Sequence, residues 1–427
     1  MAELPVPLIK ALDSLEKVSD SHDSKNCTLS LRLLHSLRSK VDLNLLGSLL
    51  NSLYSGHFSW SSDTPAPAAT YKSLEVELYL SLLLVMLLIK ENRLQESEEI
   101  ILSQLHKTHS RNSQPLIAKL YYYLGLVYEL KKDLNVDVFM RYYRVSCLKH
   151  DTFSQSVLIN IILRFYLLMN QVRLAKEFSE KTGFPETAGY PEIARNQFYL
   201  GKIKALTLNY NEAHSHLVQA ARKAPENGAG GFKLTVEKMR ILVELLMGTI
   251  PSRKSLLSFR GVSTYVDLIR AVRLGELEAY NAVLEKNKDT YVADMNYSLV
   301  IRLRHIVIKS GLRRINLAYS VISLQDVDQK LGLKQDDTEF IVAKAIRDGV
   351  IEAFIDHEAK VLKSKVLEDV YMTNEPQVLL QKRIDFCISL RNDTVKALQF
   401  PQSKNNAEVK ETNEDIDFDL LSDDDDF

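Results

Sequence analysis

The sequence has little cysteine, glycine or proline, and each of these low contents argues against a class of structure. Its 427 residues include three cysteines, Cys27, Cys147 and Cys387, which lie far apart without any CxxC or Cys/His ligand spacing. Such cysteines argue against a disulfide framework or a zinc site and favour reduced thiols in an intracellular compartment. With only 15 glycines and 11 prolines, the chain has few breaks, and helical periodicity dominates it.

The sequence also lacks an apolar run long enough to span a bilayer. The longest, residues 78–89, has twelve residues, whereas a transmembrane helix needs roughly 20, and charged residues flank it. This run therefore predicts a buried core helix. The first ten residues have no basic leader and include Pro5 and Pro7, so we expect no signal peptide.

The near-neutral total charge conceals an excess of acid at one end. Residues 402–427 hold ten acidic residues and two lysines, a net charge of −8, which leaves +7 for residues 1–401. Because this segment has few apolar residues, it cannot bury enough surface to fold alone. We predict an acidic disordered tail over 402–427, which either docks on a basic partner or stays solvated.

A repeat signal lies in the helical part of the chain. Residues 123–128, Tyr-Leu-Gly-Leu-Val-Tyr, contain the Leu-Gly-x-x-Tyr element of tetratricopeptide (TPR) repeats, and residues 199–201 repeat part of it 76 residues later. That distance suits two repeats of roughly 38 residues. Turn residues cluster at 59–69, 182–191 and 224–231. A helical array over about 72–296 follows, and its last open face needs a cover.

After this array the pattern predicts two short helices. Ser323 can cap a helix whose apolar residues Leu324, Val327 and Leu331 share one face, and Gly332 can end it. The second helix carries Asp336 and Asp337 in its first turn and ends at Gly349.

The periodicity then changes to that of strands. Apolar residues alternate over 350–355, a turn falls near 356–359, and residues 360–364 can return as a second strand. Two helices followed by a hairpin are the order of a winged helix. A hairpin edge leaves backbone groups unpaired, so a neighbouring strand can add there. We predict partner binding at this edge by Val350, Glu352, Phe354, Lys360 and Leu362; the alternative is a solvated edge guarded by lysines.

A final helix follows from Pro376, which suits a first helical turn, to about Pro401. Residues at three- and four-residue steps give it one largely apolar face. The residues of this face are Leu380, Ile384, Cys387, Ile388, Arg391, Val395 and Leu398. It either folds back on its own domain or joins a bundle of partner helices.

Patterns typical of catalysis and metal binding are missing. His214 and His216 point about 200° apart on a helix, so they cannot readily share a metal. The glycine-rich residues 228–231 lack the Gly-Lys-Ser/Thr ending of a phosphate loop, and no Gly-x-Ser-x-Gly elbow occurs. We therefore expect no enzyme activity, no cofactor and no metal.

Nucleic-acid binding is the rival function of a winged helix. The second helix carries Asp336, Asp337, Glu339 and Asp348 against two cations, whereas binding in a groove needs positive surface. The wing is more basic, but lysines on a hairpin usually protect its edge. The charge pattern makes this alternative the weaker one.

A helical array followed by a winged helix resembles the PCI-domain family, found in the proteasome lid, the COP9 signalosome and a translation initiation factor. A narrower resemblance is carried by segments 198–205, 221–225, 301–305, 339–353 and 383–387 and by the Asp-rich end. These look like the family of third non-ATPase subunits of the proteasome regulatory particle. The resemblance covers about 70–427. The chain departs from it at the N-terminus, where that family usually has a longer extension.

The resemblance implies a mainly α fold: a right-handed TPR-like helical-repeat solenoid followed by a winged-helix (PCI) subdomain and a C-terminal helix. The domains expected are an N-terminal helical segment with linker (1–71), TPR-like repeats (72–296), a PCI winged-helix module (297–366), a C-terminal bundle helix (367–401) and the acidic tail (402–427).

The resemblance also implies a function. It is that of a non-catalytic scaffold of the proteasome lid, present in cytoplasm and nucleus, that supports ubiquitin-dependent degradation. Other lid subunits would be its partners in a hetero-oligomer, bound through winged-helix edges and a bundle of C-terminal helices, with no membrane contact. The corresponding subunit of the COP9 signalosome is the alternative.

Overall fold

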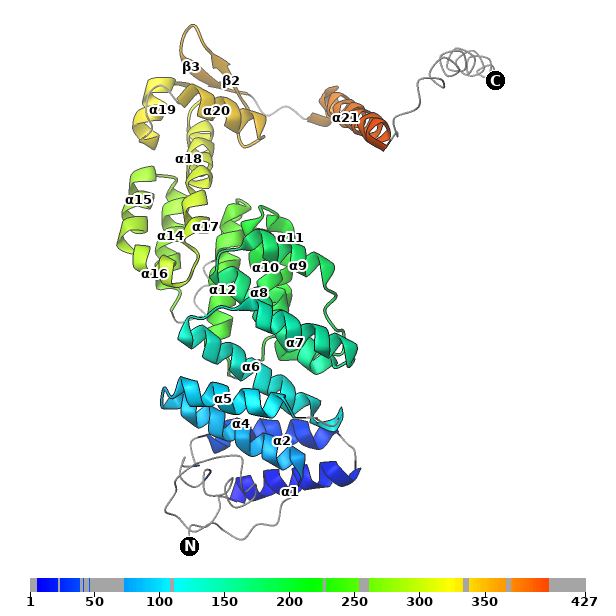
Figure 1. The fold of residues 1–427 in the computed structure, drawn as a ribbon. Coiled ribbons are helices and arrows are strands. Elements are labelled where there is room, and N and C mark those ends of the chain that lie inside the picture. The colour runs from blue at the N-terminus through cyan, green and yellow to red at the C-terminus, as the bar shows by residue number, and fades with distance from the viewer. Residues whose placement is uncertain are drawn as a thin grey trace, which may run out of the picture. The chain divides into compact units, whose positions relative to one another are not determined.

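The fold is almost entirely helical, as the sequence predicts (Figure 1). The structure, a computed structural model, describes residues 6–21, 24–38, 41, 46, 73–107, 111–225, 228–252, 261–332, 338–365 and 370–398. The chain divides into two units, residues 1–362 and 363–427, and each is described by itself. The acidic segment 402–427, the turn cluster at 59–69, and Asp336 and Asp337 lie outside the described residues.

The first unit begins with a group of helices that includes one very apolar helix, α4. These are α1 (Val6–Ser21), α2 (Ser24–Leu37), α4 (Leu74–Lys90) and α5 (Leu94–Leu105). The apolar run of the sequence lies in α4, which packs against α1, α5 and α6 and buries fourteen of its seventeen residues. The predicted core helix is therefore confirmed. Among the described residues, the helices are too short or too polar to cross a membrane.

Helical hairpins follow at the predicted spacing. After the short 3-10 helix η1 (Arg111–Ser113), they are α6 (Gln114–Lys131) with α7 (Val136–Leu148), α8 (Thr152–Leu168) with α9 (Val172–Lys181), and α10 (Tyr190–Leu206) with α11 (Tyr210–Lys223). Helix α12 (Gly230–Leu246) begins the next layer. Gly125 and Gly201 lie on α6 and α10, two hairpins apart, as a repeat of roughly 38 residues requires.

The two repeat glycines allow different close approaches. A Cβ on Gly201 would lie 2.9 Å from Cγ of Leu217 on α11, so this glycine lets the two helices of one hairpin touch. A Cβ on Gly125 would lie 3.1 Å from Ile161 on α8, so that glycine serves the contact between successive hairpins. The same sequence element thus has two packing roles.

Buried side chains form two hydrophobic cores that meet at α10. The first core runs from Leu8 to Ile203, and the second runs from Ala205 to Leu362. Helix α10 contributes Tyr199 and Ile203 to the first core and Ala205 to the second. Because the second core includes both α11 and the winged helix, the end of the helical array is covered as the sequence predicts.

The second core joins short helices to the winged helix. The helices are α14 (Ser263–Leu274), α15 (Leu277–Lys286), α16 (Lys288–Ala293), α17 (Tyr297–Arg302) and α18 (Arg304–Ala318). The winged helix consists of β1 (Val321–Ser323), α19 (Leu324–Leu331), α20 (Thr338–Arg347), β2 (Ala353–Asp356) and β3 (Val361–Ser364). Helix α18 packs against α14, α15, α19 and α20, and so connects the two groups.

Helix α19 begins and ends at the predicted residues. The Ser323 hydroxyl accepts a hydrogen bond from the Asp326 amide at 3.1 Å and donates one to Oδ2 of Asp326 at 2.7 Å. The short aspartate side chain thus bonds to the capping hydroxyl, whereas the glutamate of a usual capping box reaches the backbone. Gly332 ends the helix with a φ of 65°, and Gly349 follows α20 with a φ of 68°.

The second unit contains the short 3-10 helix η2 (Val370–Met372) and the 24-residue helix α21 (Glu375–Leu398). Pro376 lies in the first turn of α21, as predicted. None of the residues of this helix is buried.

Candidate functional site

The hairpin of the winged helix belongs to a three-stranded sheet with the order β1-β3-β2. The two outer strands are therefore β1 and β2, and β3 lies between them. Phe354 lies on β2 with 62% of its surface exposed, and Glu352, just before the strand, is also exposed. Both residues lie where a neighbouring strand could add. Val350 is half-buried and lies further from the strand.

Two residues of the predicted wing edge lie elsewhere. Leu362 is on the central strand and is 2% exposed, so its assignment to the edge was wrong. Lys360 belongs to the turn before β3, with a φ of 52°, and its carbonyl accepts a hydrogen bond from the Leu324 amide at 3.0 Å. The error arose because the pairing of β3 with β1 is not visible in the hairpin sequence.

Strand β1 was missed by the sequence reasoning. It has only three residues, and Ser323, its last, also caps α19. The available signal was the alternation of exposed Val321 with buried Ile322, which is too short to be distinguished from a loop. The missed strand supplies the second edge of the sheet.

All seven residues predicted on the face of the final helix lie on α21, and none is buried. For Leu380, Ile384, Ile388, Val395 and Leu398, the exposed fractions range from 43% to 78%. Cys387 and Arg391 are exposed as well. With about 100° per residue, these seven positions cover one side of the helix. We call this set stripe one.

A second apolar stripe on α21 was not predicted. Leu379, Phe386 and Leu390 are all more than half exposed. Their spacing of seven and four residues places them on one line, roughly 125° from the centre of stripe one. We call these three residues stripe two. The remaining side is mostly polar and includes Gln381, Lys382, Asp385, Ser389 and Asn392. A helix with two apolar sides can contact two neighbours.

A small polar cavity of about 110 Å³ lies among α6, α8 and α10. The Arg164 guanidinium donates to both carboxylate oxygens of Glu129, at 2.6 and 2.7 Å, and these bonds are the main cause of its raised pKa. Arg195 pairs with Glu192 and lies over the Tyr122 ring at 4.9 Å. The cavity has room for only about three or four waters. Its charged groups therefore tie successive hairpins together.

A larger cavity of about 320 Å³ lies among α14, α18 and α19. Its cations are already engaged: Arg314 donates to the Leu274 carbonyl at 2.6 Å, and the Lys330 ammonium lies 4.0 Å from the centre of the Tyr319 ring. No cysteine, serine or histidine is among its lining residues.

Histidines offer no metal centre in the described part of the chain, where no group of three or more metal-ligating side chains occurs. His214 and His216 are both half-buried. Nδ1 of His216 lies 2.6 Å from Oε1 of Gln197, and burial and then the charge of Lys204 lower the pKa of His216.

A helical-repeat array, a winged helix at its end and an unburied final helix define a protein of the PCI-domain class. Three family models match in this order: "PSMD3-like, N-terminal TPR repeats" at residues 57–261, the PCI domain at 284–365, and the C-terminal region of a proteasome regulatory subunit at 369–426. The chain belongs to the family of 26S proteasome non-ATPase regulatory subunit 3.

Similar proteins come from distant organisms. A probable 26S proteasome non-ATPase regulatory subunit 3 of Anopheles stephensi is 39% identical, over 97% of this chain and 91% of its own length. The 26S proteasome non-ATPase regulatory subunit 3 of Dictyostelium discoideum is 35% identical over 94% and 87%, respectively. A match over 97% of the chain must extend N-terminal of residue 70. The COP9 signalosome alternative is not favoured.

Proposed function

We propose that this chain is a non-catalytic structural subunit of the lid of the 26S proteasome regulatory particle. It would hold neighbouring lid subunits in register for ubiquitin-dependent degradation. The observation that carries the proposal is α21, a 24-residue helix with no buried residue and two apolar stripes. The names of the chain's relatives support the 26S proteasome as the complex that this helix would join. We expect the chain in both cytoplasm and nucleus, which imaging of a tagged copy tests.

Apolar burial would provide the driving force for α21 to join a helix bundle. Fully burying one leucine, isoleucine or phenylalanine side chain contributes about 1.5–3 kcal/mol. Together the two stripes hold eight large apolar side chains, including Val395. Their burial would offset part of the free-energy cost of association. The polar side would remain at the surface of the bundle.

The first experiment is affinity purification of the tagged chain at mild salt, followed by mass spectrometry of the proteins that remain bound. We expect lid and ATPase-ring subunits with the full chain. A chain that lacks residues 375–427 should stay folded, by circular dichroism, but should fail to enter the lid. Unchanged incorporation would contradict a bundle role for α21, and recovery of signalosome subunits would contradict the complex itself.

The stripes can be tested one at a time by placing the same residue on three sides of α21. We expect Ile384→Asp on stripe one and Phe386→Asp on stripe two each to reduce incorporation. Ser389→Asp is the matched control on the polar side, because it introduces the same charge three to five residues away. If only Ile384→Asp reduced incorporation, α21 would have one neighbour rather than two.

At the winged helix we propose strand addition to the outer edge of β2, where Phe354 is exposed. Phe354→Lys should weaken binding of one neighbour and leave the bundle intact, because a lysine on an edge strand opposes pairing. Phe340→Lys on α20 is the control, since Phe340 is 76% exposed but lies on a helix. Equal effects of both changes would indicate a surface other than the strand edge.

The absence of catalysis is part of the proposal. The Arg164 guanidinium in the smaller cavity is paired with Glu129, and that of Arg314 in the larger one donates to the Leu274 carbonyl. A purified chain should therefore show no hydrolysis of a ubiquitin–fluorophore conjugate or of ATP above buffer. Turnover that survives removal of co-purifying proteins would overturn this part.

A further inference from the structure

The helices that follow the repeats are joined by an unusually well-connected aspartate. Asp294 directly follows α16 and precedes α17, which leads into α18 and the winged helix. Both of its carboxylate oxygens accept hydrogen bonds from the Lys238 ammonium on α12, at 2.9 and 2.8 Å. Oδ2 also accepts a hydrogen bond from the Tyr265 hydroxyl on α14, at 3.0 Å. One carboxylate thus joins three helical elements.

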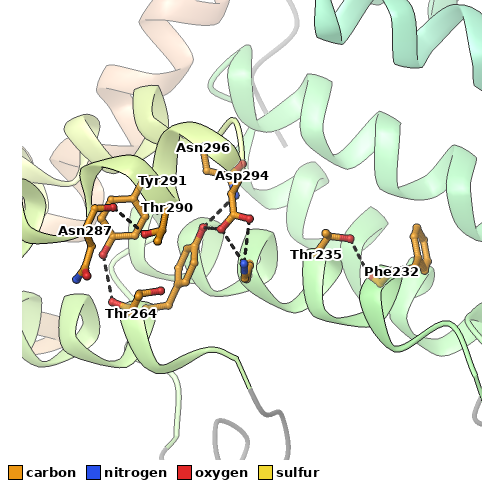
Figure 2. Close-up of polar contacts among 10 residues, drawn as sticks. Phe232, Thr235, Thr264, Asn287, Thr290, Tyr291, Asp294 and Asn296 are labelled. Carbon is orange, nitrogen blue, oxygen red and sulfur yellow. Dashed lines mark hydrogen bonds and ion pairs between the residues drawn. The ribbon is translucent and has the colours of Figure 1, made fainter. Parts of the chain in front are cut away.

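Further hydrogen bonds surround this carboxylate (Figure 2). The amide of Asn296, itself 5% exposed, donates to the Tyr265 hydroxyl at 3.3 Å. The Tyr291 hydroxyl donates to the carbonyl of Thr264, at the start of α14, at 3.1 Å. The turn after α16 is therefore held to α14 from both of its sides.

A fourth element, α10, carries a lysine whose pKa is affected by the same carboxylate. Lys202 on α10 is buried, and burial is the main cause of its lowered pKa. The positive charge of Arg164 lowers this pKa further, whereas the negative charge of Asp294 raises it. Asp294 therefore helps to keep a buried lysine protonated at the helix that belongs to both hydrophobic cores.

The backbone at this position is strained. Met295 has a φ of 54°, a left-handed conformation that is unfavourable for a non-glycine residue. Such a conformation persists only where surrounding contacts impose it. The amides of Met295 and Asn296 donate to the carbonyls of Val292 and Tyr291, at 2.9 and 3.0 Å, and close this turn. The side chains of Asp294 and Asn296 then attach the turn to α12 and α14.

A second link joins α17 to α10. The Arg302 guanidinium, at the end of α17, donates to the carbonyls of Ala205 and Leu206 at 3.5 and 3.2 Å. These carbonyls lie in the last turn of α10, where the helix dipole is negative. A later helix thus supplies a cationic C-cap to an earlier one.

We propose that Asp294 is a positioning residue, which together with Arg302 fixes the direction in which the chain leaves the helical repeats for the winged helix. The inference concerns the isolated chain and holds whether or not the chain enters the proteasome. Two sets of contacts support it: α12 and α14 hold Asp294, just before α17, and Arg302, the last residue of α17, holds the end of α10.

The test is the distribution of distances between spin labels on α9 and α20. Labels replace the exposed Arg173 and Arg347, in a chain whose Cys147 and Cys387 are changed to serine. We expect a narrow distribution for the parent and a broadened or shifted one for Asp294→Asn. Amide exchange in α17 should accelerate by at least about tenfold in the same variant, because a partly buried ion pair is lost.

Controls separate positioning from general destabilisation. Asp289→Asn removes the same charge from an exposed position five residues earlier and should leave the distribution unchanged. Lys238→Gln is the milder variant if Asp294→Asn does not fold, and it should broaden the distribution to a smaller extent. Unchanged distances in a folded Asp294→Asn or Lys238→Gln chain would overturn the proposal, and so would equal broadening in Asp289→Asn.

Discussion

Helices α4 and α21 are both rich in leucine, yet they have opposite environments. Helix α4 buries fourteen of seventeen residues inside the chain, whereas α21 buries none of twenty-four. The apolar residues of α4 surround the helix, and α1, α5 and α6 cover them. Those of α21 lie mostly in two stripes beside a largely polar side. A helix that is apolar all round is buried by other helices of its own chain, whereas exposed apolar stripes indicate contacts with other chains.

The contrast between the helices separates two kinds of stability. Changes near α4 or in the second core should alter the free energy of unfolding of the isolated chain. Changes on α21 should leave that quantity almost unchanged and act on assembly. We expect substitutions to follow this division, beginning with the largest effect.

Gly275→Ala should produce the largest loss of stability. Gly275 has a φ of 72°, and a Cβ there would lie 2.5 Å from the amide nitrogen of Gly311. Because the obstacle is backbone, the helices must separate, and we expect a loss of about 3 kcal/mol or more from strain and overpacking. Denaturant unfolding measures it. Gly183→Ala is the control: no atom lies within 4 Å of its Cβ, so the change should stay within about 0.5 kcal/mol.

A pair of identical substitutions compares the two helices directly. Leu80→Ala in α4 removes a fully buried side chain and should cost about 2–5 kcal/mol in unfolding free energy. Leu380→Ala in α21 removes a side chain that is 58% exposed and should cost less than about 0.5 kcal/mol in the isolated chain. A large loss from Leu380→Ala would show that α21 packs on its own chain.

Two serine-to-alanine changes make a finer comparison. Ser323→Ala removes the hydroxyl that caps α19 and should cost about 1 kcal/mol. Ser389→Ala, inside α21, should change stability by no more than about 0.5 kcal/mol, because alanine has the better helix propensity. Thermal unfolding of both variants checks this. Equal losses would mean that the cap contributes nothing specific.

The cysteines should give the smallest effect. Burial, and then the charge of Glu75, raise the pKa of Cys27 from 9.0 to about 11, whereas Cys387 is exposed. An unfolded chain loses the Cys27 proton first, so this contribution to stability is complete below pH 9 and is lost as pH rises towards 11. Cys27→Ala should flatten the fall in stability over this range. A thiol reagent at about pH 8 should modify Cys387 quickly and Cys27 only after unfolding; rapid modification of both would contradict the burial.

Much of the fold could be predicted because its signals are local. The limits of α19 follow from Ser323 and Gly332, and the hairpin repeat follows from the spacing of Gly125 and Gly201. Stripe two of α21 was equally available in the sequence, at steps of seven and four residues. It was missed because one apolar stripe already explained the helix.

The remaining features depend on residues that are distant in sequence. Asp294 contacts Lys238, 56 residues earlier, and Tyr265, 29 residues earlier, and no local pattern marks these three as partners. The edge assignment of Leu362 failed for the same reason, since β1 pairs with β3 across two intervening helices and a strand.

The sequence by itself determined where helices such as α19 begin and end, because caps, turns and apolar periods act over a few residues. It also determined the class of fold and the family. Only the tertiary structure decided the strand order, the connections of Asp294 and the lack of burial along α21. These depend on which distant surfaces meet, and local chemistry does not specify that pairing.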